Sequence, residues 1–221
     1  MPAPTPTDVW DLPTRLFHWA LAALIALQYA SGEFGLLSMA WHFYMGYATL
    51  ALIVFRVLWG FVGSQTSRFS DFVRGPAAVL RHLRDNLRGG AATTLGHNPL
   101  GGWSVLAMLA AIAVQAISGL FASDDLTETG PLAGRVSDRT VALMTRIHLI
   151  DRYVLLALIV LHMGAVAAHW VFRNENLVAP MLHGRKYADR AIRTAPLWIA
   201  AVLALASAAA VAALVAWGAR G

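Results

Sequence analysis

The sequence contains no cysteine. Disulfide bonds, iron–sulfur clusters, thiolate-ligated haem and covalently attached c-type haem are therefore excluded. Any bound metal must be held by histidine, methionine, aspartate or glutamate. Charged residues are also scarce, at 13% of the 221 residues against 58% hydrophobic residues, and soluble domains carry about twice that charged fraction. The composition predicts an integral membrane protein.

The N-terminal segment lacks the pattern of a cleavable signal peptide. Before the first apolar stretch, Asp8 and Asp11 stand against a single basic residue, Arg15. A signal peptide begins with a basic region that leads into an apolar core. We expect the first span to be inserted directly and retained.

Five apolar stretches are candidates for membrane spans, each of which needs about 20 residues. Only helices satisfy the backbone in lipid at this length, so the sequence predicts an all-α integral membrane helical bundle. The first stretch is short, and we expect it to extend past Gly32 toward Leu37. The five stretches are Leu16–Ser31, Trp41–Val62, Leu100–Ala122, Ile147–Val171 and Pro196–Trp217.

The basic residues predict the orientation of these spans. With the N-terminus inside, twelve Arg and Lys residues lie at the inner connections, and the outer loops hold only Arg135, Arg139 and Arg146. Inner loops carry the excess of basic residues, so we expect a bacterial inner-membrane protein with a cytoplasmic N-terminus and a periplasmic C-terminus. In the inner connection, Pro76–Arg88 predicts an amphipathic helix lying on anionic lipid. A solvated helix packed on the bundle is the alternative.

Histidines supply the clearest functional signal. His148 and His162 stand fourteen positions apart in the fourth predicted span, a spacing that returns to nearly the same helix face and advances about 21 Å. The fourth span runs from outside to inside, so the topology pairs His18 with His162 near the inside and His42 with His148 near the outside. Ionisable residues inside a membrane indicate function, and facing helices build cofactor sites in this way. We interpret the two pairs as ligands of two bis-histidine haems b.

The remaining histidines fit other roles. We interpret His82, His97 and His183 as non-ligands. His169 follows His162 by seven residues on nearly the same face, about 10 Å further inside, and we interpret it as an interfacial residue or a neighbour of a haem propionate. A single histidine at a membrane edge can equally be an interfacial anchor.

Small and basic residues near these histidines suit a haem. Gly46 and Gly164 would let a flat macrocycle approach the backbone, although helix packing explains such glycines equally well. Arg56, with Arg15 and Arg146, could pair with propionates, or could be ordinary inner-side or surface arginines. The fifth span has no histidine and a ladder of alanines at every fourth position. We expect it to close the bundle or to form an oligomer contact.

Nine motifs together, rather than any one alone, carry a family resemblance. They are Val9–Trp19, Gly46–Tyr47, Phe55–Gly63, Phe72–Pro76, Gly96–Trp103, Gly119–Ala122, Leu161–His162, Glu175–Val178 and Gly184–Lys186. From about Val9 to Lys186 the chain resembles the prokaryotic cytochrome b561 family, which is related to the b-type cytochrome subunits of nickel–iron hydrogenases.

The resemblance implies a four-helix membrane bundle that holds two haems b from its first, second and fourth helices. His18 and His162 would hold the inner haem, and His42 and His148 the outer one. Family members usually have an aromatic or aliphatic residue at the place of His169. We therefore predict a dihaem domain over residues 1–186, then a linker and an additional C-terminal transmembrane helix over residues 187–221.

The predicted function is electron transfer between the quinone pool and a periplasmic redox partner such as a cytochrome c. The family also implies superoxide oxidation coupled to quinone reduction, for which Arg139, Arg146 and Arg152 could supply positive charge at the outer side. A membrane anchor for a hydrogenase or another dehydrogenase is a further version. From another class, a histidine-lined metal or proton transporter would need acidic groups at mid-depth, which the spans lack. Partners would include membrane lipid, and the oligomeric state is left open.

Overall fold

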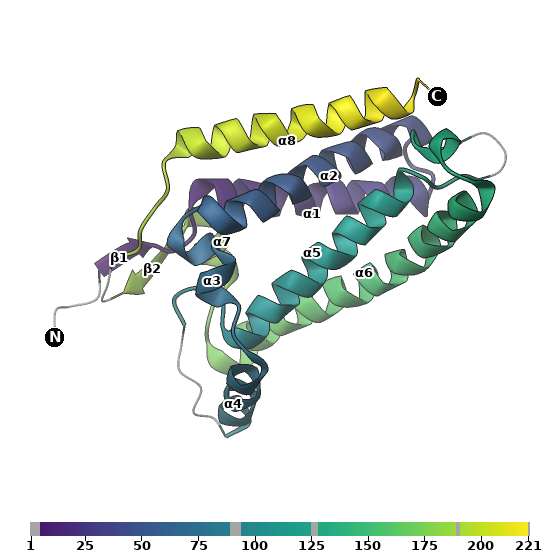
Figure 1. Cartoon of the computed structure of the whole chain (residues 1–221). Coiled ribbons are helices and arrows are strands. Elements are labelled where there is room, and N and C mark those ends of the chain that lie inside the picture. The colour runs from purple at the N-terminus through teal and green to yellow at the C-terminus, as the bar shows by residue number, and fades with distance from the viewer. Residues whose placement is uncertain (1–4, 89–93, 125–127, 189–190, 221) are drawn as a thin grey trace. The chain divides into compact units, whose positions relative to one another are not determined.

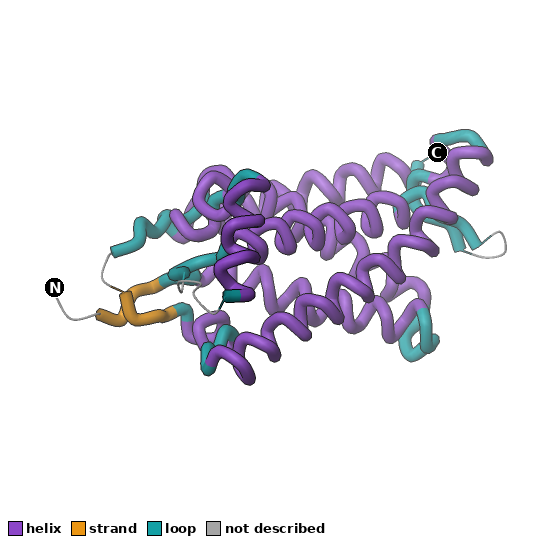
Figure 2. The backbone as a smooth tube through the Cα atoms, turned by 90° about the horizontal axis from the view of Figure 1, so that it is seen from below, coloured by secondary structure: helices purple, strands orange, loops and turns teal. Residues whose placement is uncertain are grey.

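A computed structural model describes residues 5–88, 94–124, 128–188 and 191–220. Helices make up most of these residues (Figures 1 and 2). They comprise eight α-helices and two short 3-10 helices, η1 (Gln65–Ser67) and η2 (Ala133–Arg135), beside two strands. The α-helices are α1 (Leu12–Gly32), α2 (Met39–Val62), α3 (Phe69–Phe72), α4 (Pro76–Leu87), α5 (Pro99–Gly119), α6 (Asp138–Arg173), α7 (Val178–His183) and α8 (Leu197–Gly218).

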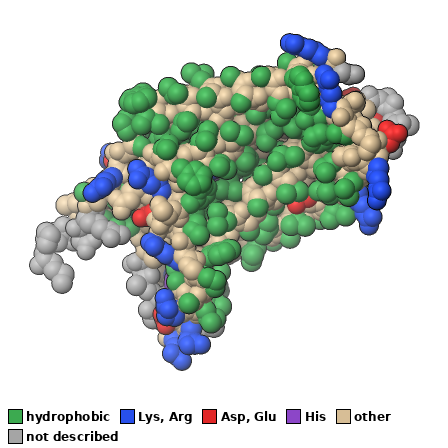
Figure 3. Space-filling model, in the orientation of Figure 1, with side chains coloured by type: hydrophobic (Ala, Val, Ile, Leu, Met, Phe, Trp, Pro, Cys, Tyr) green, Lys and Arg blue, Asp and Glu red, His purple; other side chains and the backbone are tan. Residues whose placement is uncertain are grey.

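Four of the described helices, α2, α5, α6 and α8, are long and apolar enough to cross a membrane. The chain is therefore a helical, multi-pass membrane protein. Hydrophobic side chains cover the visible face of α8 (Figure 3). Val202, Leu205 and Trp217 of this helix are exposed and suited to lipid contact. Helix α1 has 21 residues, but polar side chains lower its hydropathy, so its crossing stays a prediction.

Two helix boundaries differ from the sequence-based expectation. Helix α1 ends at Gly32, so its expected extension toward Leu37 is wrong. Gly35, at a φ of 61°, donates its N–H to the oxygen of Ser31 at 3.2 Å, and a left-handed glycine of this kind terminates helices. Helix α6 begins at Asp138, well before the predicted Ile147, so much of the predicted outer loop is helical. The acidic residue in its first turn favours a helix start there.

The chain divides into two compact units. The first unit comprises Met1–Leu16, Val57–Met108 and Leu158–Ala200, and the second comprises Phe17–Arg56, Leu109–Ala157 and Ala201–Gly221. The long helices contribute residues to both.

In the first unit, the strands β1 (Thr5–Asp8) and β2 (Arg185–Ala188) pair antiparallel. After β1, the carboxylate of Asp11 caps α1 by accepting the N–H of Thr14 at 2.9 Å. The same carboxylate accepts the Nε1–H of Trp59 at 3.1 Å, and this tryptophan is fully buried. One side chain thus starts α1 and satisfies a polar group in the core of the unit.

Helix α4, also in the first unit, confirms the helix predicted over this segment, and its arginines gather on one part of the surface (Figure 3). Leu80 and Leu83 are exposed. Arg173, at the end of α6, donates to the main-chain oxygen of Asn86 at 3.1 Å. The placement of α4 on lipid stays a prediction.

The second unit has a core that joins α2, α5, the segment after α5, and α8. Leu50, Leu120, Leu132 and Val211 form this buried cluster. Near the end of α8 the backbones approach closely, because a Cβ atom on Gly218 would lie 2.4 Å from the main-chain oxygen of Pro131. Helix α8 is therefore a packed part of this unit.

Candidate functional site

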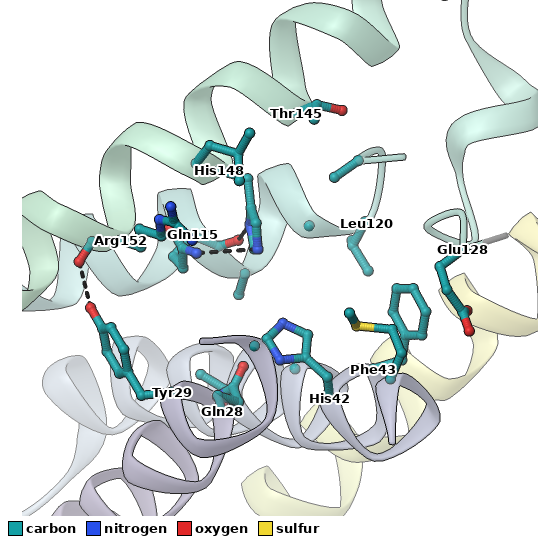
Figure 4. A pocket seen from close by; sticks show the side chains of 18 of the residues that line it. Gln28, Tyr29, His42, Phe43, Gln115, Leu120, Glu128, Thr145, His148 and Arg152 are labelled. Carbon is teal, nitrogen blue, oxygen red and sulfur yellow. Dashed lines mark hydrogen bonds between the residues drawn. The ribbon is translucent and has the colours of Figure 1, made fainter. Parts of the chain in front are cut away.

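A pocket of about 350 Å³ lies within the second unit (Figure 4). This volume falls in the range of small-molecule and cofactor sites. His42, from α2, and His148, from α6, both line it and face each other across it (Figure 4). Their ring centres are 6.3 Å apart, with the ring planes at 81°. The structure thus brings together two of the histidines that the sequence put forward as a pair.

The separation of the two rings fits one metal ion between them. A metal–imidazole bond is about 2 Å long, and the ring centre lies about 1 Å beyond the bound nitrogen. Two imidazoles on opposite sides of one iron would therefore have centres roughly 6 Å apart. The distance between His42 and His148 matches this arrangement.

Hydrogen bonds fix the tautomer of His148. Its Nδ1 lies 2.9 Å from the main-chain oxygen of Gln115 and 3.3 Å from the hydroxyl of Ser118. A carbonyl oxygen only accepts, so Nδ1 carries the ring proton and Nε2 keeps its lone pair. The Gln115 amide nitrogen lies 3.2 Å from this Nε2 and donates to it.

His42 has the same tautomer. Its Nδ1 lies 2.9 Å from the hydroxyl of Ser31, and this hydroxyl donates its own proton to the main-chain oxygen of Gln28 at 3.0 Å. The hydroxyl must therefore accept from Nδ1–H, which leaves the lone pair of the ring on Nε2. Metal-bound histidines commonly donate the other ring N–H to a fixed acceptor, as both rings do here.

Two glycines lie against the imidazoles. A Cβ atom on Gly32 would lie 3.2 Å from Cε1 of His42, and one on Gly119 would lie 3.0 Å from Cε1 of His148. Gly46 and Gly164, the glycines predicted from the sequence to lie near a haem, are placed differently. Gly46 lines the pocket, and a Cβ atom on Gly164 would meet nothing within 4 Å.

The charged side chains of the pocket are mostly acidic. Glu33, Asp124 and Glu128 line it beside a single basic residue, Arg152. Arg152 forms an ion pair with Glu33, and the hydroxyl of Tyr29 donates to the main-chain oxygen of Arg152. Of the three arginines considered for an outer positive patch, only Arg152 lines this pocket, and its charge is compensated.

Arg146 lines an adjoining cavity of about 660 Å³ in the second unit, which shares Ser123, Thr145 and Leu149 with this pocket. Arg139 is exposed. In the described residues no cluster of three or more His, Asp or Glu side chains is arranged to hold a metal ion.

The two histidines of the other proposed ligand pair belong to different units. His18 belongs to the second unit and His162 to the first, so their pairing stays a prediction. Arg56, one of the arginines considered for a propionate, is buried at 2% exposure. Another of them, Arg15, donates to the main-chain oxygen of Leu182 within the first unit.

The histidines interpreted as non-ligands have other contacts. His97 lies in the first unit between Trp10 and Phe72, with ring centres 4.7 and 4.8 Å away. The Nδ1 of His169 lies 3.0 Å from the main-chain oxygen of Ala165, one turn earlier in α6. The Nδ1 of His183 lies 3.1 Å from the backbone nitrogen of Arg185. His82 lies on α4.

Four of the motifs that carry the family resemblance contribute side chains to the first unit, namely Trp10, Trp59, Phe72 and His97. The rings of Trp10 and Phe72 pack against His97. In a comparison with known proteins, residues 9–184 match the family model of prokaryotic cytochrome b561. No curated protein matched the chain. The matched family comprises b-type membrane cytochromes, which bind haem b and transfer electrons. Because the match covers most of its length, this chain belongs to the prokaryotic cytochrome b561 family.

Proposed function

We propose that this protein is a dihaem cytochrome of the bacterial inner membrane, which transfers electrons between the quinone pool and a periplasmic redox partner. The observation that carries the proposal is the pair of His42 and His148, whose rings face each other at 6.3 Å in one pocket. Two imidazole ligands, from His42 and His148, would leave no open site on a bound haem iron, which suits electron transfer. When bound, the haem supplies the one-electron chemistry.

The chain's own residues would hold the haem and set its properties. His42 and His148 would be the ligands, each oriented through its Nδ1–H. Apolar side chains such as Ile25, Phe43 and Leu155 also line the pocket. They keep water from its interior, and burial of this kind is one of the factors that set the potential of a haem iron.

The second haem, in this proposal, is held by His18 and His162. This part rests on the topology predicted from the sequence and on the family resemblance. It includes a fifth membrane crossing by α1, a cytoplasmic N-terminus and a periplasmic C-terminus. Arg56 is the proposed partner of a propionate of this inner haem.

The charge of the described pocket bears on the partner. Its lining combines three carboxylates with one arginine that is already paired. Such a lining attracts cations and repels anions. It therefore supports a neutral quinol or a periplasmic cytochrome c with a basic face over the superoxide anion.

The first experiment counts haems. We expect the purified full-length protein to contain two haems b per chain by pyridine haemochrome analysis. His42→Ala and His148→Ala should each lose one haem, and the double variant should also retain one, because both residues serve the same site. His82→Ala, on α4, is the control and should retain both. A folded protein without haem would contradict the proposal. A double variant that retains no haem would also contradict it, because the two histidines would then serve different sites.

A second experiment tests electron transfer. The protein is inserted into lipid vesicles with ferricyanide trapped inside, and a quinol analogue is added outside. We expect reduction of both haems and consumption of ferricyanide, which His42→Ala should slow. Haems that the quinol does not reduce would contradict the link to quinone.

A further inference from the structure

The two histidines of the described pocket lie against the same short sequence pattern. Gln28-Tyr-Ala-Ser31-Gly32 ends α1, and Gln115-Ala-Ile-Ser118-Gly119 ends α5. Each pattern is glutamine, two other residues, serine and glycine, and the next long helix along the chain carries the histidine. The chain therefore uses one pattern twice, once for each ring.

The serines of the two patterns make matching bonds. The hydroxyl of Ser31 donates to the main-chain oxygen of Gln28 at 3.0 Å, and that of Ser118 donates to the main-chain oxygen of Gln115 at 3.1 Å. Each hydroxyl thereby donates its proton to a main-chain oxygen of its own helix. Each oxygen then faces an imidazole as an acceptor only.

The glycines match as well. At both positions the missing Cβ would lie nearest to Cε1 of the histidine and next nearest to Nδ1. The same edge of each ring therefore rests on the helix end. Together the serine and the glycine fix both the direction of the Nδ1–H bond and the distance of the ring from the helix.

The two copies of the pattern differ in the distance between the serine oxygen and Nδ1 of the histidine. For His42 the serine oxygen lies 2.9 Å from Nδ1. For His148 the serine oxygen is at 3.3 Å, and the main-chain oxygen of Gln115 is nearer, at 2.9 Å. Loss of the hydroxyl should therefore affect His42 more than His148, which keeps its bond to the carbonyl.

We propose that the two Gln-x-x-Ser-Gly patterns form a paired positioning device for the axial ligands of this haem, in which Ser31 and Ser118 are positioning residues and Ser31 has the larger effect. This inference rests on the proposed function. A bond from Nδ1–H to an acceptor raises the basicity of a ligating imidazole. Higher basicity stabilises ferric iron, so loss of the acceptor should raise the midpoint potential.

The test compares Ser31→Ala and Ser118→Ala in the full-length haem-loaded protein. Ser207→Ala is the matched control, because this serine of α8 is 2% exposed and its hydroxyl has no hydrogen-bond partner among the described residues. The readouts are the haem-to-protein ratio, the midpoint potential of each haem in a redox titration, and the electron paramagnetic resonance spectrum of the ferric haems.

We expect all three variants to keep two haems. Ser31→Ala should raise the midpoint potential of one haem. The expected size is a three- to tenfold change in its ferric–ferrous equilibrium, and a tenfold change corresponds to about 59 mV. It should also alter one ferric signal. Ser118→Ala should produce a smaller shift of the same haem, and Ser207→Ala none.

Unchanged potentials and spectra in Ser31→Ala would overturn the inference, as would a shift of equal size in Ser207→Ala or a larger one in Ser118→Ala. If Ser31→Ala loses one haem, Ser31→Thr keeps the hydroxyl and should restore it; failure to restore it counts against the inference. If the unaltered protein holds no haem, the proposed function fails instead, so the two failures are distinguishable.

Discussion

The guanidinium of Arg135 donates to the main-chain oxygen of Trp217 at 2.7 Å and lies 4.6 Å from the centre of the same tryptophan ring. It thereby caps the C-terminal end of α8, where a cation is favourable. We expect Arg135→Ala to destabilise the protein by about 1 kcal/mol, from the lost cap and cation–π contact. Thermal unfolding in detergent measures this. Arg139→Ala, an exposed arginine on α6, should leave the transition unchanged.

Asp11 should be among the most important polar residues for stability in the first unit. Asp11→Ala removes both the cap of α1 and the acceptor of the buried Trp59 indole, and we expect a loss of about 2–4 kcal/mol. Asp11→Asn keeps a good capping residue and should cost less. The control is Asp8→Ala, since the ion pair of Asp8 with Arg185 is exposed and such pairs contribute about 0–1 kcal/mol. Equal losses for Asp8 and Asp11 would contradict this.

Gly119→Ala should displace a haem ligand. The new methyl group would lie 3.0 Å from Cε1 of His148, so the ring or the helix must shift. We expect haem content to fall from two toward one per chain, although alanine usually stabilises a helix by about 1 kcal/mol relative to glycine. Gly75→Ala has nothing within 4 Å of its Cβ and serves as the control. Full haem content in Gly119→Ala would show that the glycine is not needed for ligand placement.

The second ligand pair can be tested against its nearest competitor. His162→Ala should remove one haem, and combining it with His42→Ala should remove both, because the two histidines serve different sites. His169→Ala should retain two haems, since its ring is bonded to its own helix. The number of haems per chain in these three variants shows whether His162 or His169 is the ligand. Loss of haem from His169→Ala alone would reverse the assignment.

The acidic lining predicts how small oxidants approach the pocket. We expect the reduced protein to react with a cationic cobalt(III) complex at a rate that falls with ionic strength. Glu128→Gln should slow that reaction about 2–3-fold by weakening the local field. Asp138→Asn changes a residue that lines the adjoining cavity but not this pocket and should have less effect. Stopped-flow mixing gives both rates. A rate that rises with salt would indicate a positive approach surface.

The sequence predicted the elements that depend on local composition. Apolar runs of about 20 residues located α2, α5, α6 and α8, and the predicted topology paired His42 with His148 because it placed both near the outer side. The start of α6 was missed because Arg139 and Arg146 interrupt its apolar pattern, although Asp138 was an available signal for a helix start.

The rest of the site depended on contacts between distant segments. The ion pair of Glu33 with Arg152 joins residues from α6 and the segment after α1, and no local pattern relates the two. The repeated Gln-x-x-Ser-Gly pattern was visible in the sequence. Its proposed role, however, depends on contact with a histidine of another helix, which the sequence alone does not show. Gly46 and Gly164 are near the histidines in the sequence. The glycines that lie against the imidazoles in space, Gly32 and Gly119, are further from them in the sequence and were not predicted.

The close packing of α8 has a consequence for how this protein should be shortened or fused. The family match ends at residue 184, yet Val211 lies in the same buried cluster as Leu50 and Leu120. Cutting the chain where the family resemblance stops would expose that cluster and remove the surface against which the Pro131 segment rests. In this chain the family match ends before the helix that completes the buried cluster of the second unit.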